Sequence, residues 1–173
     1  MGERLRHLRH LVGRFFASLF AREPVPGEVA RVRAILTPPE FAVWVAMPRA
    51  DRAESLATLR RLPPEVAADD RWAAAALLHD AGKGSANLGT FGRVLATARG
   101  HVGDPARVGG RAGRYLHHAE IGADLLGSAG ARAEVVAWAA THHEPSQWPV
   151  ASIPEDVCAA LAAADGEKVG SLR

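Results

Sequence analysis

The sequence predicts an all-α protein, and three observations support this fold class. Alanine, which has the highest intrinsic helix propensity, is the commonest residue of the chain. Apolar residues recur at intervals of three and four along several segments, whereas the alternating runs of valine, isoleucine and threonine that are typical of strands are absent. With 173 residues, the chain is long enough for one domain with a buried core.

Prolines bound the predicted helices of the first half of the chain. A first helix ends near Arg22, ahead of Pro24 and Pro26. In the helix over 37–48, Thr37 is the expected cap, with Pro38 at the first helical position and Glu40 completing a capping box. The predicted helices of this half are 1–22, 28–36, 37–48 and 51–62, the last of them capped by Asp51.

In the second half, the predicted helices are 70–81, 88–98, 114–126, 131–143 and 155–169. Residues 84–113 are rich in glycine, and a proline-containing loop precedes the last helix. We expect residues 1–50 to form a helical extension that packs on the core, and residues 51–173 to form a single globular unit.

Residues 1–22 combine a basic face with an apolar stripe, because five arginines oppose one glutamate and leucines and phenylalanines recur at helical spacing. Such a helix either packs on its own domain, or lies on an anionic membrane or docks on a partner protein. No nucleic-acid partner is expected, because the net charge is only +2 and no aromatic residues interleave with the arginines for base stacking.

The chain shows no sign of export or of membrane insertion. No apolar run approaches the roughly 20 residues of a membrane span, and the N-terminus lacks the features of a secretory signal. Cys158 is the single cysteine, so no internal disulfide can form. These features predict a cytoplasmic location.

Five residues that can bind metal lie at the inward edges of predicted helices, in phase with or directly after apolar residues. They are His79, Asp80, His118, His142 and Asp165. Buried imidazoles and carboxylates are costly unless they are paired or bind a metal. The set therefore predicts a shared divalent cation, with a hydrogen-bonded network that lacks metal as the alternative. Helical phase favours His118 over His117, and His142 over His143.

Four segments resemble motifs of the HD-domain metal-dependent phosphohydrolases, in particular those of the HDIG type. Leu77–Lys83 is similar to the central motif, and His118–Ala123 to the next histidine segment. Thr141–Glu144 is similar to the following histidine motif, and Ala163–Asp165 to the terminal aspartate. Their order and spacing fit the family across residues 51–169.

The resemblance implies an HD-domain-like helical bundle with a mono- or dinuclear metal centre that acts on phosphate esters. The implied ligands of one ion are His79, Asp80 and Asp165, and those of a second ion are Asp80 as a bridge, His118 and His142, with His143 as a further candidate. Mixed nitrogen and oxygen ligation suits iron, manganese, cobalt or zinc better than calcium, and magnesium is also considered.

The resemblance also suggests residues that act on the substrate. Asp80 is the catalytic candidate at the metal, and Lys83 follows it closely enough to meet a phosphate. Arg107, Arg111 and Arg114 precede His118 and are candidate phosphate-binding residues, or else solvated surface arginines.

One departure from the family concerns the histidine that normally precedes the HD pair. No histidine lies between His10 and His79, and Glu54 occupies the corresponding place, where it is a candidate metal ligand. Glu54 nevertheless shares a polar helical face with Thr58 and Arg61. The chain also lacks the Gly-Tyr-Pro segment of the subgroup that cleaves cyclic di-GMP, which disfavours that subgroup.

Two functions from different classes follow. The first is a metal-dependent phosphohydrolase for a nucleotide or another small phosphate ester. The second is a catalytically degenerate HD domain that binds metal or a nucleotide as a sensor or scaffold, and it is motivated by the missing upstream histidine.

Overall fold

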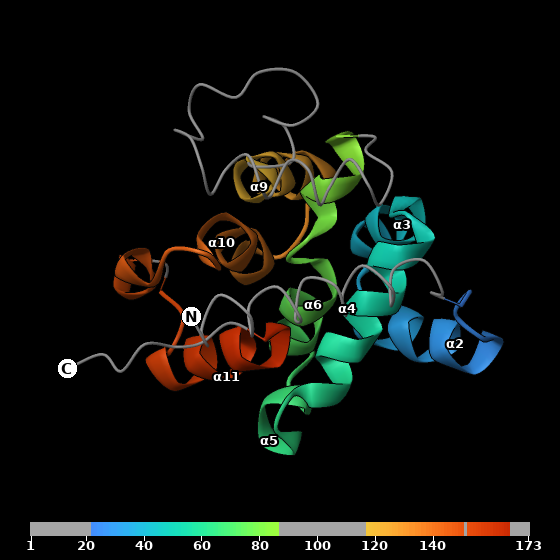
Figure 1. Ribbon diagram of the computed structural model, residues 1–173, viewed down its shortest axis with the longest axis horizontal. Helices are drawn as coiled ribbons and strands as arrows, with labels where there is room; N and C mark the ends of the chain where they lie inside the picture. Colours follow the sequence, from blue (N-terminus) through green and yellow to red (C-terminus); the bar gives the residue numbers. More distant parts are fainter. Residues whose placement is uncertain (1–21, 87–116, 151, 167–173) are drawn as a thin grey trace, which may run out of the picture.

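The computed structural model describes residues 22–86, 117–150 and 152–166, and these ranges contain helices and no strand (Figure 1). The predicted helix over 88–98, and all but the last residue of that over 1–22, lie outside the described residues. No described helix is long and apolar enough to cross a membrane. The all-α prediction is therefore confirmed, whereas the cytoplasmic location and the contacts of residues 1–22 stay predictions.

The described α-helices are α2 (Pro26–Ile35), α3 (Pro38–Ala46), α4 (Arg49–Arg61), α5 (Pro64–Ala67), α6 (Asp70–Leu78), α9 (His118–Ala129), α10 (Ala133–Thr141) and α11 (Glu155–Asp165). Two 3₁₀ helices join them, η1 (Ala81–Ala86) and η3 (Pro145–Val150). The sequence pattern does not predict α5 and η3, which are one or two turns long and begin at prolines.

Several predicted boundaries differ from those of the structure, and two of these differences have a clear physical cause. Asp51 is not the cap of α4, because Pro48 fixes the backbone for helix entry and the helix begins at Arg49. The helix predicted over 70–81 ends at Leu78, and the chain tightens into η1 two residues later. By contrast, α3 begins as predicted, with Pro38 at its first position and the carboxylate of Glu40 accepting a 2.9 Å hydrogen bond from the backbone N–H of Thr37.

Helix α6 lies in the middle of the bundle and contacts α2, α3, α4, α5, α10 and α11 (Figure 1). Its residues Trp72–Leu78 are all buried. A helix that is apolar on every side must be enclosed, and the run of alanines lets its neighbours approach closely. His79 directly follows this enclosed helix as its C-terminal cap and is therefore buried as well.

Helices α2 and α3 share this core, since Val32 and Trp44 are buried in the same hydrophobic cluster as α6. The carboxylate of Glu40 is fully buried and receives hydrogen bonds from the Arg132 side chain at the start of α10, at 2.7 and 2.9 Å. This ion pair fastens the N-terminal part of the described chain to its C-terminal half. A division of the chain at residue 50 stays a proposal.

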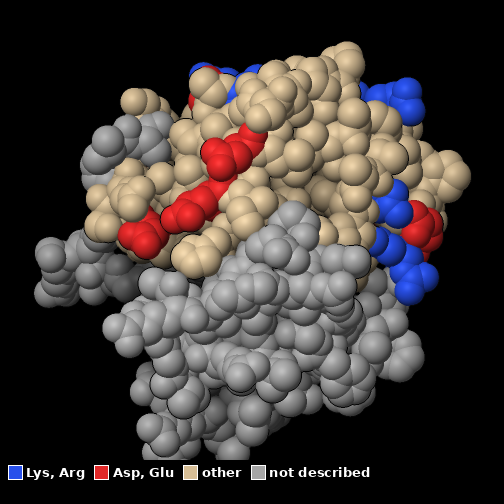
Figure 2. Space-filling view, turned by 90° about the horizontal axis from the view of Figure 1, so that it is seen from above, with Lys and Arg blue, Asp and Glu red and all other residues tan. Residues whose placement is uncertain are grey.

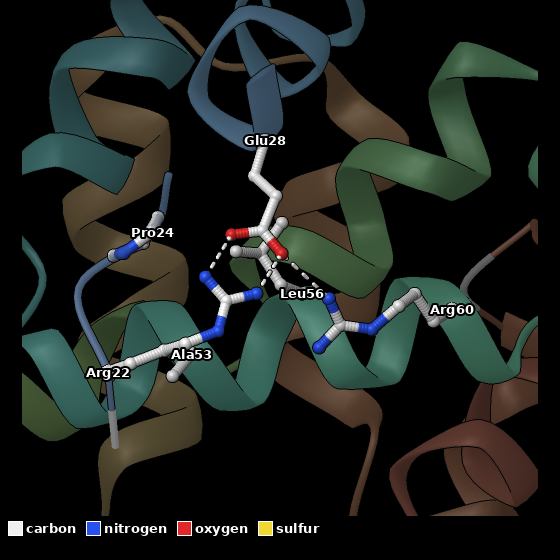
Figure 3. Close-up of a pocket in the computed structure, with 6 residues that line it drawn as sticks. All are labelled: Arg22, Pro24, Glu28, Ala53, Leu56 and Arg60. Atoms are coloured by element: carbon white, nitrogen blue, oxygen red, sulfur yellow. Dashed lines mark hydrogen bonds and ion pairs between the residues drawn. The ribbon is translucent and has the colours of Figure 1, made fainter. Parts of the chain in front are cut away.

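A small surface pocket lies between α2 and α4, with Glu28 at its centre (Figure 3). The Glu28 carboxylate accepts hydrogen bonds from Arg22 at 2.6 and 3.0 Å and from Arg60 at 3.0 Å. Both arginines are more than half exposed, so these pairs contribute little to stability. The pocket is a solvated ion-pair cluster on the outside of the bundle.

Charged side chains are separated on the face seen from above in Figure 2, where carboxylates form a row and the basic groups lie at the edges. Helix α9, at the top of Figure 1, carries the exposed residues Glu120 and Asp124 one turn apart. On the described part of this face, carboxylates are thus gathered in one row, apart from most of the basic groups.

Candidate metal centre

Five potential metal ligands lie at the ends of four helices. His79 and His142 are the C-terminal caps of α6 and α10, and Asp165 is the last residue of α11. His118 is the first residue of α9, and Asp80 follows His79. All five are buried, with exposed fractions between 2% and 8%. Three helix C-termini, each with partial negative charge, thus converge where a cation would bind.

The first ligand group consists of His79, Asp80 and Asp165. Nε2 of His79 lies 3.2 Å from Oδ1 of Asp165 and 3.4 Å from Oδ2 of Asp80. The second group consists of His118, His142 and His143, and the Nε2 atoms of His118 and His143 lie 3.0 Å apart. Within each group, the ligand atoms all lie within 4.8 Å of one another.

The carboxylate of Asp80 joins the two groups. Its Oδ2 faces His79, whereas its Oδ1 lies 3.2 Å from Nε2 of His118 and 3.8 Å from Nε2 of His142. One carboxylate is therefore within reach of histidines from both groups, which is the arrangement needed to bridge two ions.

The ligand atoms fit a metal better than they fit one another. Nε2 of His79 and of His142, and Oδ1 of Asp80 and of Asp165, are buried and have no aligned hydrogen bond in the described part of the chain. Leaving four such atoms unsatisfied is costly. Ligands about 2.1 Å from one ion stand about 3 Å apart in octahedral geometry. The contacts of His79 with its two carboxylates, at 3.2 and 3.4 Å, and the 3.0 Å contact between His118 and His143 are close to this spacing.

Backbone hydrogen bonds fix the two cap histidines for ligation. Nδ1 of His79 lies 3.0 Å from the carbonyl oxygen of Ala76, and Nδ1 of His142 lies 2.9 Å from that of Ala139. A carbonyl oxygen only accepts, so each Nδ1 carries the proton and donates it. When the ring is neutral, its lone pair is therefore on Nε2, the atom that points into the centre.

The charges of the centre favour a cation. Burial disfavours the charged form of His79, but the carboxylates of Asp80 and Asp165 outweigh burial and hold the pKa of His79 well above its ordinary value. Burial also opposes ionisation of Asp165, yet the nearby His79 lowers the pKa of Asp165 to about 2. Burial lowers the pKa of both His118 and His142, which keeps these rings neutral. The first group thus attracts positive charge, and the second offers neutral nitrogen ligands.

A comparison with known protein families matches residues 53–166 to the HD domain. The chain belongs to the HD-domain family. The HD domain defines a superfamily of metal-dependent phosphohydrolases. The matched segment contains the five buried ligand candidates described above. No curated protein and no solved structure matches the chain.

Lys83 lies beside the centre of this HD domain. It is 8% exposed on η1, and its ammonium group forms an ion pair with Oδ2 of Asp80. Attraction to Lys83 also helps to hold the pKa of Asp80 well below its ordinary value, although burial acts in the opposite sense. A cation of the chain therefore stands next to the carboxylate that joins the two ligand groups.

The histidine neighbours differ as helical phase predicts. His118 and His142 are buried, whereas the side chain of His117 is 42% exposed and pairs with Glu120. His143 is exposed, but its ring nitrogen contacts His118, so it belongs to the second ligand group. Metal ligation by His118, His142 and His143 stays a prediction.

Glu54 is not brought to the centre. Its side chain is 35% exposed, and its carboxylate accepts a 3.0 Å hydrogen bond from Arg61. Arg61 also donates to Thr58, which matches the polar face expected from the sequence. The buried acid of α4 is instead Asp51, at 6% exposure. Asp51 lies four residues before Ser55 and seven before Thr58, which are also buried, so it is on the inward face of α4.

We expect that Glu54→Ala leaves the metal content of the purified chain unchanged, because the carboxylate it removes binds Arg61. Asp165→Ala is the matched comparison and should lose the ion of the first group. Elemental analysis of both variants checks this. A loss of metal from the Glu54 variant equal to that from the Asp165 variant would identify Glu54 as a ligand.

The candidate phosphate-binding residues Arg107, Arg111 and Arg114 lie outside the described residues. Their role stays a prediction.

Proposed function

We propose that this HD domain hydrolyses a nucleotide or another small phosphate ester with the help of one or two divalent ions. The observation that carries the proposal is the carboxylate of Asp80, which lies beside Lys83 and between two ligand groups whose members are buried except for His143. Ions bound there would supply the chemistry of metal-assisted hydrolysis, namely a lowered pKa of a bound water and a positive charge beside phosphoryl oxygens. The metal is iron, manganese, cobalt, zinc or magnesium.

The residues of the chain have distinct tasks in this proposal. Asp80, His79 and Asp165 would hold the first ion, and Asp80 would also contact the second, which His118, His142 and His143 would hold. The backbone hydrogen bonds to His79 and His142 keep both rings in the ligating orientation. Lys83 donates a hydrogen bond to a phosphate oxygen, since its ammonium group already lies next to an oxygen of the centre. Arg107, Arg111 and Arg114 are proposed to bind further phosphate oxygens.

The alternative is an HD domain that binds metal or a nucleotide as a sensor or scaffold. The position of Glu54 favours it, because the helix upstream of the HD pair brings neither a histidine nor this glutamate to the first ligand group. Such a protein binds metal but releases no phosphate.

The direct test is to remove metal with a chelator, restore each candidate metal in turn, and measure phosphate release from a panel of nucleotides and simple esters. We expect no hydrolysis without metal and recovery with at least one of the five metals. Lys83→Met should then lower kcat/KM by about 100-fold while metal content is retained, since loss of one donor to a developing charge costs about that much. Metal uptake without hydrolysis of any ester would instead support the sensor.

A further inference from the structure

Two glycines form a close backbone contact between η1, which begins directly after Asp80, and the helix that carries His118. Gly82 lies on η1 and Gly122 on α9, both buried, and these two elements pack on each other. A Cβ atom added at Gly82 would lie 2.0 Å from the carbonyl oxygen of His118 and 2.6 Å from the backbone nitrogen of Gly122. Real contacts are never this short, so only glycine fits at position 82.

The contact falls on the first turn of α9. In an α-helix the carbonyl of residue 118 accepts the hydrogen bond of the amide of residue 122, so these two atoms are partners. Gly82 packs directly on that bond, and one end of the bond belongs to the ligand His118 itself. From the other side, a Cβ at Gly122 would lie 3.0 Å from the nitrogen of Gly82 and 3.9 Å from the carbonyl oxygen of His79. The contact thus connects the backbones of ligands from both groups.

We propose that Gly82 and Gly122 are positioning residues that set the spacing of the two ligand groups, so that the Asp80 carboxylate can serve both. The distance of 3.2 Å between Oδ1 of Asp80 and Nε2 of His118 depends on how closely η1 approaches α9. The first group depends less on this approach, because none of its members lies on α9. His79 caps α6, Asp80 follows it, and Asp165 is the last residue of α11. The inference rests on the metal binding of the proposed function.

Three substitutions by alanine give a graded test. At Gly82, the added methyl must displace the backbone of His118 by about 1 Å, because the tightest real contacts are near 3 Å. At Gly122, a shift of a few tenths of an ångström relieves the 3.0 Å contact. At Gly127, also within α9, no atom lies within 4 Å of an added Cβ, which makes Gly127→Ala the matched control.

The experiment is calorimetric titration of the metal-free full chain with Mn²⁺, repeated with Co²⁺ and its visible absorption spectrum, in the wild type and the three variants. We expect two ions in the wild type and in Gly127→Ala. Gly122→Ala should keep the first ion and bind the second about 10- to 100-fold more weakly, which is the usual cost of disturbing the surroundings of a ligand. Gly82→Ala should bind one ion only.

Thermal unfolding of each metal-free variant separates positioning from mere packing. Glycine is a poor residue inside a helix, so Gly127→Ala should melt at the same or a slightly higher temperature. If the affinities of both ions fall together in Gly122→Ala, or neither falls, the glycines do not set the spacing and the inference is overturned. Should Gly82→Ala fail to fold, Gly122→Ala alone decides.

Two further outcomes distinguish this inference from the proposed function. A wild type that takes up a single ion overturns the inference, yet leaves metal-dependent hydrolysis standing. A wild type that takes up two ions and hydrolyses no ester contradicts the proposed function, while the variants still decide the role of the glycines. A wild type that takes up no ion contradicts both.

Discussion

Asp80→Asn is expected to abolish binding of the second metal ion, weaken that of the first, and lower phosphate ester hydrolysis by about a thousandfold or more. The substitution keeps the shape of the side chain but removes its charge. Asp80 is the residue that approaches His79, His118 and His142, and its Oδ1 is a buried atom without an aligned hydrogen bond. An amide at this place offers one weak oxygen ligand and adds N–H groups that face the histidine nitrogens.

Thermal unfolding with and without metal gives a measurement that is independent of activity. An ion that binds only the folded chain stabilises it by about 2.7 kcal/mol when its concentration is 100 times its dissociation constant. The wild type should therefore melt at a higher temperature with metal, and Asp80→Asn should show little or no rise. Asp124→Asn is the matched control, because Asp124 is exposed on α9 and belongs to neither ligand group.

The metal affinity of the wild type should also depend on pH in a defined direction. Since the pKa of metal-free His79 is raised well above its ordinary value, this ring carries a proton that a metal ion must displace. Metal affinity of the wild type should rise as the pH rises through the pKa of His79. An Asp80→Asn variant with unchanged metal content at every pH would rule out the assigned centre.

The helices and the inward members of the histidine pairs could be predicted because they depend on local patterns. Apolar spacing marks the faces on which His118 and His142 lie, and Pro38 with Glu40 marks the start of α3. The end of α9 shows the limit of such patterns. The helix continues past Gly127 to Ala129 and is capped by Gly130, whose φ of 80° glycine adopts without strain.

Contacts between distant segments could not be predicted from the sequence. The helix predicted to run to residue 81 stops at Leu78, and η1 then packs on α9, some forty residues further along. Nor does a local pattern tell which acid of α4 turns inward when Asp51 and Glu54 are three residues apart. A contact with a distant helix distinguishes them. Arg61 donates a 2.5 Å hydrogen bond to the carbonyl of Ala164 on α11, and the same guanidinium group holds the Glu54 carboxylate at the surface.

For the same reason, the sequence did not predict the ion pair between Glu40 and Arg132, which are 92 residues apart. The sequence identified Glu40 only as a residue of a capping box. In the structure it is fully buried, and it accepts from the backbone N–H of Arg132 at 3.0 Å as well as from the guanidinium group. Arg132 donates in addition to the carbonyl of Ile35 at the end of α2. One arginine thus holds α2, α3 and α10 together.

We expect Glu40→Ala to lower the free energy of unfolding by about 3 kcal/mol, because removing one partner of a buried ion pair leaves the other charge uncompensated. This lies at the low end for such pairs, since the side chain of Arg132 is 22% exposed and water can reach it. For a chain of this size the melting temperature should fall by about 10 °C. Thermal and urea unfolding of the metal-free protein measure the effect.

Glu28→Ala is the matched control. Glu28 occupies the same third position of its helix, accepts from the N–H of Val25 at 3.0 Å and pairs with two arginines, but it does so at the surface. Its loss should change stability little, because solvent screens these pairs. Equal destabilisation by both substitutions would mean that the capping hydrogen bond, and not the buried charge, accounts for the effect of Glu40.

The pH dependence of stability separates charge from packing. Burial alone raises the pKa of Glu40, but the hydrogen bonds from Arg132 outweigh it and hold the pKa below 4.5. A carboxylate with a lowered pKa contributes its full stability above the pKa of the unfolded chain, and this contribution is lost as the pH falls through the folded pKa. The difference in stability between the wild type and Glu40→Gln should therefore be constant from pH 7 down to about 5 and shrink below pH 4.5. A difference that persists unchanged at pH 3 would show that the shape of the Glu40 side chain, and not its charge, holds α3 against α10.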